Sequence, residues 1–163
     1  RYLNSFKMTV KTYLEKAAHN SFYIPISEKD GTEINQKFGK RVICHINGGK
    51  IHSAVQKNKS LGRYIMVGKS TQEKINAEYG DELTIKIEKD TTEFQAEMPE
   101  ELEEVLLTDE EAKFYFDKLT PGKKRTILYH VAKAKQSETR INRALKIAEN
   151  LKMGMTDLKE IMR

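Results

Sequence analysis

Tryptophan is absent from the sequence, cysteine occurs once and proline three times. The single cysteine, Cys44, has no partner for an internal disulfide, which favours a reducing compartment, so we expect a cytoplasmic protein. No apolar run approaches the roughly 18 to 20 residues that a membrane-spanning helix needs, and the mean hydropathy is −0.67. The first residues also lack the apolar core of a retained secretory signal. The sequence therefore predicts no membrane span.

The sequence also lacks the spacings of common catalytic and cofactor sites. Gly68-Lys69-Ser70 is similar to the end of a phosphate-binding loop, but Arg63 stands where that loop needs its first glycine. Cys44 and His45 are neighbours on a predicted strand, so their side chains point to opposite faces and the imidazole cannot activate the thiol. We expect no cofactor and favour a protein that is not an enzyme. An enzyme of unknown class is kept as an alternative.

Alternation of apolar and polar residues predicts strands in the first 97 residues. The segments with this pattern are 5–14, which includes Phe6, Met8 and Val10, then 21–26, 40–55, 64–67, 83–87 and 92–97. Between 64–67 and 83–87 we predict a short helix, with Ser70 and Glu73 as its capping box and Gly80 at its end. The segment 27–39, with Asp30-Gly31 as a turn, is expected to be a loop holding at most one or two helical turns.

The segment 40–55 is a predicted hairpin with two possible registers. A turn at Gly48-Gly49 pairs Ile46 with Ile51 and gathers most apolar residues on one face, whereas a turn at Asn47-Gly48 pairs Ile46 with Gly49. The first register is the prediction. It places His45 opposite His52 as a weak candidate for metal binding. A zinc site needs three or four ligands and no further ligand is placed beside these two, so we expect no metal.

Strand alternation stops at Met98-Pro99, and helical periodicity with repeated capping residues begins. We therefore predict two domains, a β-barrel domain over residues 1–97 and a helical domain over 98–163. In the helix predicted to begin at Ser137 and end at Gly154, the residues expected to face inward are Ile141, Ala144, Leu145, Ala148 and Leu151. The predicted fold class is α+β, with a small closed β-barrel that carries one short helix, followed by a helical bundle.

Charge divides the C-terminal region into two parts. Residues 98–117 hold eight acidic residues against one lysine, and residues 118–163 hold twelve basic residues against four acidic ones. Either the two parts attract each other within the bundle, or the basic part faces an anionic partner. The candidate ligand-binding residues are Lys123, Lys124, Lys135, Thr139, Arg140 and Arg143. Under the first interpretation, Arg140 or Arg143 pairs with acidic side chains of the first two helices or holds a small anion.

Several short motifs carry a resemblance to a known family. The C-terminal ones are Leu119-Thr120-Pro121, Lys123-Lys124-Arg125, Ala134-Lys135, Glu138-Thr139-Arg140 and Arg143. This pattern resembles the small helical domain of the YdeI / OmpD-associated family, although members often carry a tryptophan where this chain has Tyr129 to Val131. The N-terminal ones are Ile24-Pro25, Ile46-Asn47-Gly48, Gly62-Arg63-Tyr64 and Gly80-Asp81. They resemble the barrel domain of unknown function that is often fused to that family, and this resemblance implies that the β-barrel has the double-split form.

The resemblance implies an uncharacterised bacterial protein with a loose link to bacteriocin protection or outer-membrane proteins. We predict a non-enzymatic binding module for an anionic ligand or a protein partner, acting in a stress, envelope or bacteriocin-protection pathway. The alternative is a nucleic-acid-binding regulator, because the barrel is similar to those of DNA-binding antitoxins. Nucleic acid is disfavoured, since residues 98–163 carry a net charge of only +1 and few aromatic residues lie among the basic ones.

Overall fold

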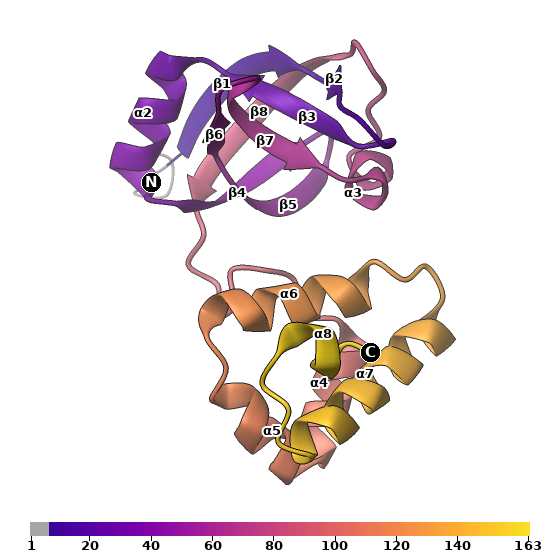
Figure 1. Cartoon of the computed structure of the whole chain (residues 1–163). Helices are drawn as coiled ribbons and strands as arrows, with labels where there is room; N and C mark the ends of the chain where they lie inside the picture. Colours follow the sequence, from indigo (N-terminus) through magenta and orange to yellow (C-terminus); the bar gives the residue numbers. More distant parts are fainter. Residues whose placement is uncertain (1–6) are drawn as a thin grey trace. The chain divides into compact units, whose positions relative to one another are not determined.

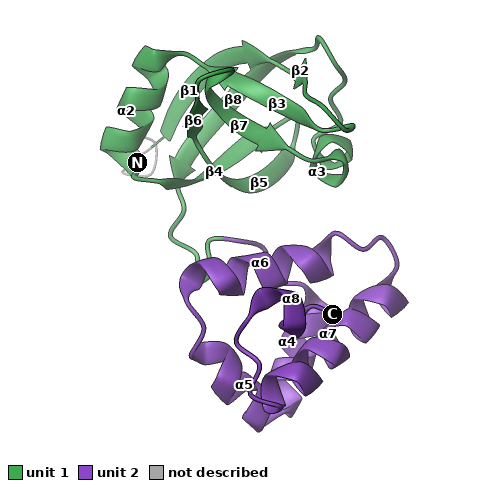
Figure 2. Cartoon of the chain, in the orientation of Figure 1, with its two compact units in different colours: residues 1–95 green, residues 96–163 purple. Residues whose placement is uncertain are grey.

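The computed structural model describes residues 7–163, and the chain divides into two compact units, residues 1–95 and 96–163 (Figures 1 and 2). Strands dominate the first unit and helices form the second, so the expected α+β class is confirmed. The predicted strand over 5–14 is observed from Lys7 onward, and Ser5 and Phe6 lie outside the described residues. Within residues 7–163, no helix is both long and apolar enough to cross a membrane.

The strands of the first unit pair into two four-stranded antiparallel sheets. They are β1 (Lys7–Tyr13), β2 (Glu15–Lys16), β3 (Phe22–Ile26), β4 (Arg41–Ile46), β5 (Gly49–Ala54), β6 (Gln56–Asn58), β7 (Gly62–Val67) and β8 (Glu82–Lys89). The strand orders are β1-β8-β4-β5 and β2-β3-β7-β6. The expected barrel thus takes the form of two sheets around one apolar core. Thr12 Oγ1 donates to Pro25 O at 2.6 Å and joins β1 to β3, where proline has no N–H to extend the ladder.

The hairpin of β4 and β5 has the register that the sequence analysis rejected. Ile46 pairs with Gly49, and the turn is Asn47-Gly48, whose φ angles are 50° and 80°. Positive φ at both central residues is the type I′ geometry that suits Asn-Gly. Gly49 is needed for packing, because a Cβ there would lie 3.0 Å from the Lys74 carbonyl oxygen. The predicted pairing was wrong because it read this glycine as a turn residue.

The segment predicted as a loop contains the helix α2 (Glu28–Phe38), which begins at Ser27 with a side-chain oxygen that accepts from the Asp30 N–H at 3.0 Å. Gly31 therefore lies inside a helix and not in a turn. A Cβ on this glycine would collide with the Arg63 side chain, which packs over it. The glycine reflects a tertiary contact that the local sequence does not display.

Three further local predictions for this unit were wrong. Helix α3 (Lys69–Lys74) begins at Gly68 without a side-chain cap, so Ser70 lies in the first turn and not at the cap. The helix ends at Lys74, and Gly80, predicted as its end, lies in the turn that precedes β8. The strand predicted over 92–97 is not formed, because the chain turns after β8. Asp90 Oδ1 accepts the Thr92 N–H at 3.0 Å, and Gln95 has a positive φ of 54°.

The second unit is a bundle of helices arranged around α7. The helices are α4 (Glu100–Thr108), α5 (Glu110–Asp117), α6 (Pro121–Ala132), α7 (Ser137–Lys152) and α8 (Leu158–Ile161). Thr120 caps α6 by accepting the Lys123 N–H at 3.3 Å, and Pro121 occupies the first helical position. Asp109 caps helix α5 by accepting the Ala112 N–H at 3.1 Å. The central side chains of the core are Leu102, Phe116, Ile127, Leu128, Val131, Ile147, Leu151 and Ile161.

Helix α7 buries a different face from the one predicted. Ala144, Ala148 and Leu151 are buried as expected, together with Ile147, but Ile141 is 42% exposed and Leu145 is 53% exposed. The apolar residues of α7 span an arc wider than its neighbours cover. The bundle buries the stripe that starts at Ala144 and continues three, four and seven residues after it. Ile141 and Leu145, four residues apart, are left as an exposed apolar ridge.

Candidate functional site

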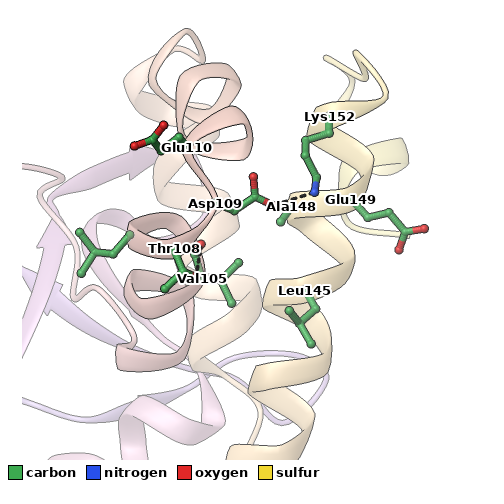
Figure 3. Close-up of a pocket in the computed structure, with 9 residues that line it drawn as sticks. Val105, Thr108, Asp109, Glu110, Leu145, Ala148, Glu149 and Lys152 are labelled. Carbon is green, nitrogen blue, oxygen red and sulfur yellow. Dashed lines mark hydrogen bonds and ion pairs between the residues drawn. The ribbon is translucent and has the colours of Figure 1, made fainter.

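A groove of about 750 Å³ lies between α7 on one side and α4 with the start of α5 on the other. Val105 and Leu145 face each other from the two walls, as Figure 3 shows. Ala148 lies along the α7 wall between Leu145 and Lys152. The residues that line the groove are Val105, Leu107, Thr108, Asp109, Glu110, Leu145, Ala148, Glu149 and Lys152. The groove therefore continues the exposed apolar ridge of α7 toward the C-terminal end of that helix.

An ion pair spans one end of the groove. Lys152 Nζ lies 2.7 Å from Asp109 Oδ2 (Figure 3), and Asp109 Oδ1 also accepts the Ala112 N–H at 3.1 Å. The hydrogen bond from Lys152, followed by that from Ala112, holds the pKa of Asp109 below its ordinary value. The same carboxylate raises the pKa of Lys152. Both groups are therefore charged at neutral pH and largely satisfy each other.

The remaining acidic side chains of the groove lie on its rim. Glu110 and Glu149 are exposed and point away from the apolar walls (Figure 3). The lining residues include neither histidine nor cysteine. Among residues 7–163, no group of three or more histidine, cysteine, aspartate or glutamate side chains is placed to hold a metal ion. The arrangement provides aliphatic contact and ion pairing, which are the interactions of a binding surface.

The six predicted ligand-binding residues fall into two separate groups. Lys123 and Lys124 lie at the start of α6, where Lys123 Nζ donates to Thr156 O at 2.9 Å. Lys124 Nζ lies 5.8 Å from the centroid of the Phe116 ring, within range of a cation–π contact. The other four residues lie where α6 is followed by α7, namely Lys135, Thr139, Arg140 and Arg143. The structure thus places the predicted set at the two ends of α6.

Arg140 makes internal contacts that hold the α6–α7 loop against α4. Its Nε lies 3.0 Å from Glu101 Oε2, and its Nη1 donates to the carbonyl oxygens of Ala134 at 2.8 Å and Lys135 at 2.9 Å. The backbone N–H of Glu101, the Ser137 hydroxyl and Arg140 together lower the pKa of the Glu101 carboxyl. This contact agrees with the interpretation that the basic part pairs with the acidic first helices.

Arg143 stabilises the end of α6. Its Nη1 donates to His130 O at 2.7 Å, which places a cation at the negative end of a helix. Burial, followed by the positive charges of Arg143 and Lys133, lowers the pKa of the His130 imidazole. The charges of Lys133 and Arg143 make the electrostatic potential here locally positive. We name the surface formed by His130, Lys133 and Arg143 the basic corner.

The two candidate metal-binding histidines are not a pair. In the observed register His45 lies opposite Lys50, and His52 lies opposite Ile43. His45 is hydrogen-bonded to Glu88. His52 Nδ1 lies 2.6 Å from Asp90 Oδ2. Their placement directly opposite each other in the prediction followed from the wrong hairpin register.

Asp90 is a buried carboxylate that the sequence analysis missed. It is 1% exposed and accepts bonds from the N–H and the hydroxyl of Thr92 in addition to His52. Burial raises the pKa of Asp90, but these hydrogen bonds outweigh it and the net pKa is lowered.

Cys44 packs inside the sheets, where burial raises the pKa of its thiol to about 12. A thiol with that pKa is protonated and unreactive at neutral pH.

These features define a small α+β protein in which the helical unit carries both an apolar groove and a basic corner. Residues 95–154 match the family described as Bacteriocin-protection, YdeI or OmpD-Associated. The resemblance predicted from the C-terminal motifs is therefore confirmed for this region, which contains the whole groove and the whole basic corner. No curated protein matches the chain.

Proposed function

We propose that the protein is a non-enzymatic binding module that engages a protein partner through the groove between α4 and α7. The supporting observation is the exposed ridge of Ile141 and Leu145, of which Leu145 faces Val105 across the groove. Contiguous apolar side chains that a bundle leaves uncovered, with charged residues around them, are typical of interaction surfaces. The charged side chains of the groove are paired or lie on its rim. A partner that contacts the apolar walls therefore leaves these charged side chains in contact with water.

The family description supports placing this module in an envelope or bacteriocin-protection pathway. A cytoplasmic location agrees with the single protonated thiol of Cys44, which is buried between the sheets and makes no disulfide. In this proposal the helical unit recognises the partner, and the two-sheet unit has no assigned role.

The test compares partner binding by Leu145→Ser with binding by Met153→Ser. Met153 is 68% exposed on the end of the same helix but does not line the groove, so it is the matched control. Partners enriched from bacterial extract are purified, and their Kd for the full chain is measured by calorimetry. Loss of one buried leucine contact is worth about 1–2 kcal/mol, so Leu145→Ser is expected to raise Kd about tenfold while Met153→Ser does not.

Circular dichroism of both variants shows whether they keep the helical content of the native chain. A purified partner that binds Leu145→Ser as tightly as the native chain would contradict the proposal. The proposal is also contradicted if none of the enriched proteins binds the full chain after purification.

The second candidate is an anion-binding function at the basic corner, with nucleic acid as the polymeric form of such a ligand. The neighbouring positive charges of Lys133 and Arg143 favour it, because a positive potential attracts phosphate or carboxylate. Against it, Arg140 and Arg143 donate to carbonyl groups within the unit.

We expect weak binding of random-sequence duplex or single-stranded DNA in fluorescence anisotropy measured across a salt series. A true phosphate-binding surface loses affinity with a log–log slope of about −0.9 for each phosphate contact. Lys133→Ala removes one charge of the corner while the Arg143 contact is kept. Submicromolar binding that is steep in salt and weakened by Lys133→Ala would favour this candidate over the groove.

A further inference from the structure

We propose that the groove takes a basic amphipathic helix of a partner protein, an inference that rests on the proposed function. The observations that lead to it are the length of the apolar ridge, the side-chain character of both walls and the charge of the rim. Each of these restricts the kind of segment that can fill the groove.

The shape of the groove favours a helix over an extended segment. Ile141 to Lys152 covers twelve residues of α7, and these residues rise about 16 Å along the helix, or about three turns. A facing helix of that length places side chains at spacings of three, four and seven residues between the ridges of α7 and α4. An extended peptide needs partners for its backbone N–H and C=O groups. Both walls are helices whose backbone groups bond internally, so they offer no strand edge to such a peptide.

The charge of the rim favours a basic helix. Three carboxylates line the groove, those of Asp109, Glu110 and Glu149, against the single ammonium of Lys152, which is paired with Asp109. Lys146 Nζ lies 4.0 Å from Glu149 Oε2, and because both side chains are exposed this is a weak contact.

The wall formed by α4 and α5 is acidic beyond the groove itself. Helix α4 contains no lysine or arginine, and the one lysine of α5, Lys113, is paired with Asp117 at 2.8 Å. Exposed carboxylates of this wall outside the groove are Glu103, Glu104 and Glu111. A partner helix with lysine or arginine on both sides of its apolar stripe therefore meets opposite charge, which increases the rate of association and excludes acidic partners.

The direct test uses synthetic helical peptides of about 14 residues, a length that covers the groove with about one residue to spare at each end. The first peptide has leucines at spacings of three and four on one face and lysine elsewhere. The second replaces every lysine with glutamate, and the third has the composition of the first with the leucines scattered around the helix. Each peptide carries fluorescein, and its anisotropy is measured with the full chain.

We expect the lysine peptide to bind at least tenfold more tightly than the glutamate and scattered peptides. Leu145→Ser is expected to weaken its binding about tenfold, a change of about 1.4 kcal/mol, and Met153→Ser is expected to leave it unchanged. The double substitution Glu110→Gln and Glu149→Gln is expected to reduce the preference for lysine over glutamate without changing the fold, because both side chains are exposed.

The other outcomes separate this inference from the proposed function. Equal or tighter binding of the glutamate peptide overturns the inference, and dependence of that binding on Leu145 still supports a binding groove. If no peptide binds but a purified partner binds in a way that depends on Leu145, only the inference of a basic helix is overturned and the proposed function stands. Leu145-dependent dimers in sedimentation overturn it in favour of a second copy of the chain. Failure of both the peptides and the partners overturns both proposals.

Discussion

Phe116→Ala is expected to unfold the helical unit while the two-sheet unit stays folded. Phe116 is 1% exposed at the centre of the bundle, and removing a buried phenylalanine side chain costs about 3–5 kcal/mol. A unit of this size has a free energy of unfolding of about 3–10 kcal/mol, from about 0.05–0.15 kcal/mol per residue. The loss is therefore comparable with the whole stability of the second unit.

The measurement is guanidinium unfolding followed by amide NMR signals assigned to each unit. Phe114→Ala is the matched control, because Phe114 lies on the same helix and is 55% exposed. Its ring contacts Tyr115 and the Lys118 ammonium at the surface, so its loss is expected to cost less than about 1 kcal/mol. If Phe116→Ala unfolds both units in one transition, the two units are not independent folding units.

Local sequence chemistry predicted the elements of the helical unit well and its packing less well. The Thr120-Pro121 start of α6 is specified by neighbouring residues, because a cap and a proline act within one turn. The buried face of α7 is not. Its apolar residues support two overlapping stripes, and only the positions of α4, α5 and α6 decide that Ala144 faces inward while Leu145 does not.

The errors in the two-sheet unit have a common physical cause. Gly31 and Gly49 were read as turn residues, but each lacks a side chain because another part of the chain packs against it, namely Arg63 and the Lys74 carbonyl. A glycine that serves a close contact looks the same in sequence as one that serves a turn. The register of a hairpin and the existence of a helix both depended on that distinction.

The candidate site was only partly accessible to sequence reasoning. One of the two interpretations of the charge division was that basic residues pair with the acidic first helices, and the contact of Arg140 with Glu101 is such a pair. The groove depends on two helices far apart in the sequence lying side by side, and no local pattern specifies this. Asp90 was missed because an aspartate followed by two threonines resembles an exposed turn.

Asp90→Ala is expected to be the most destabilising polar substitution in the two-sheet unit. The side chains of Asp90 and His52 are 0% and 7% exposed, and the substitution leaves His52 and both donors of Thr92 without their acceptor. Leaving a buried hydrogen-bonding group without its partner costs about 1–3 kcal/mol for each such group. Glu88→Gln is the matched control, because Glu88 also bonds to a histidine, His45, but both side chains are about one-third exposed. Its expected cost is below about 1 kcal/mol.

The same substitution is expected to change how stability depends on pH. The pKa of Asp90 is lower in the folded than in the unfolded chain, so its ionised form favours folding. Its contribution is complete above the unfolded pKa, near 4, and is lost as the pH falls through the folded pKa. Urea unfolding followed by the amide signals of β8, from neutral pH to about pH 2, should show that the native chain loses this contribution in acid. Asp90→Ala should lack that part of the decline, so the stabilities of the two proteins converge at the lowest pH. A difference between them that stayed constant across the range would show that Asp90 acts by packing alone and not through its charge.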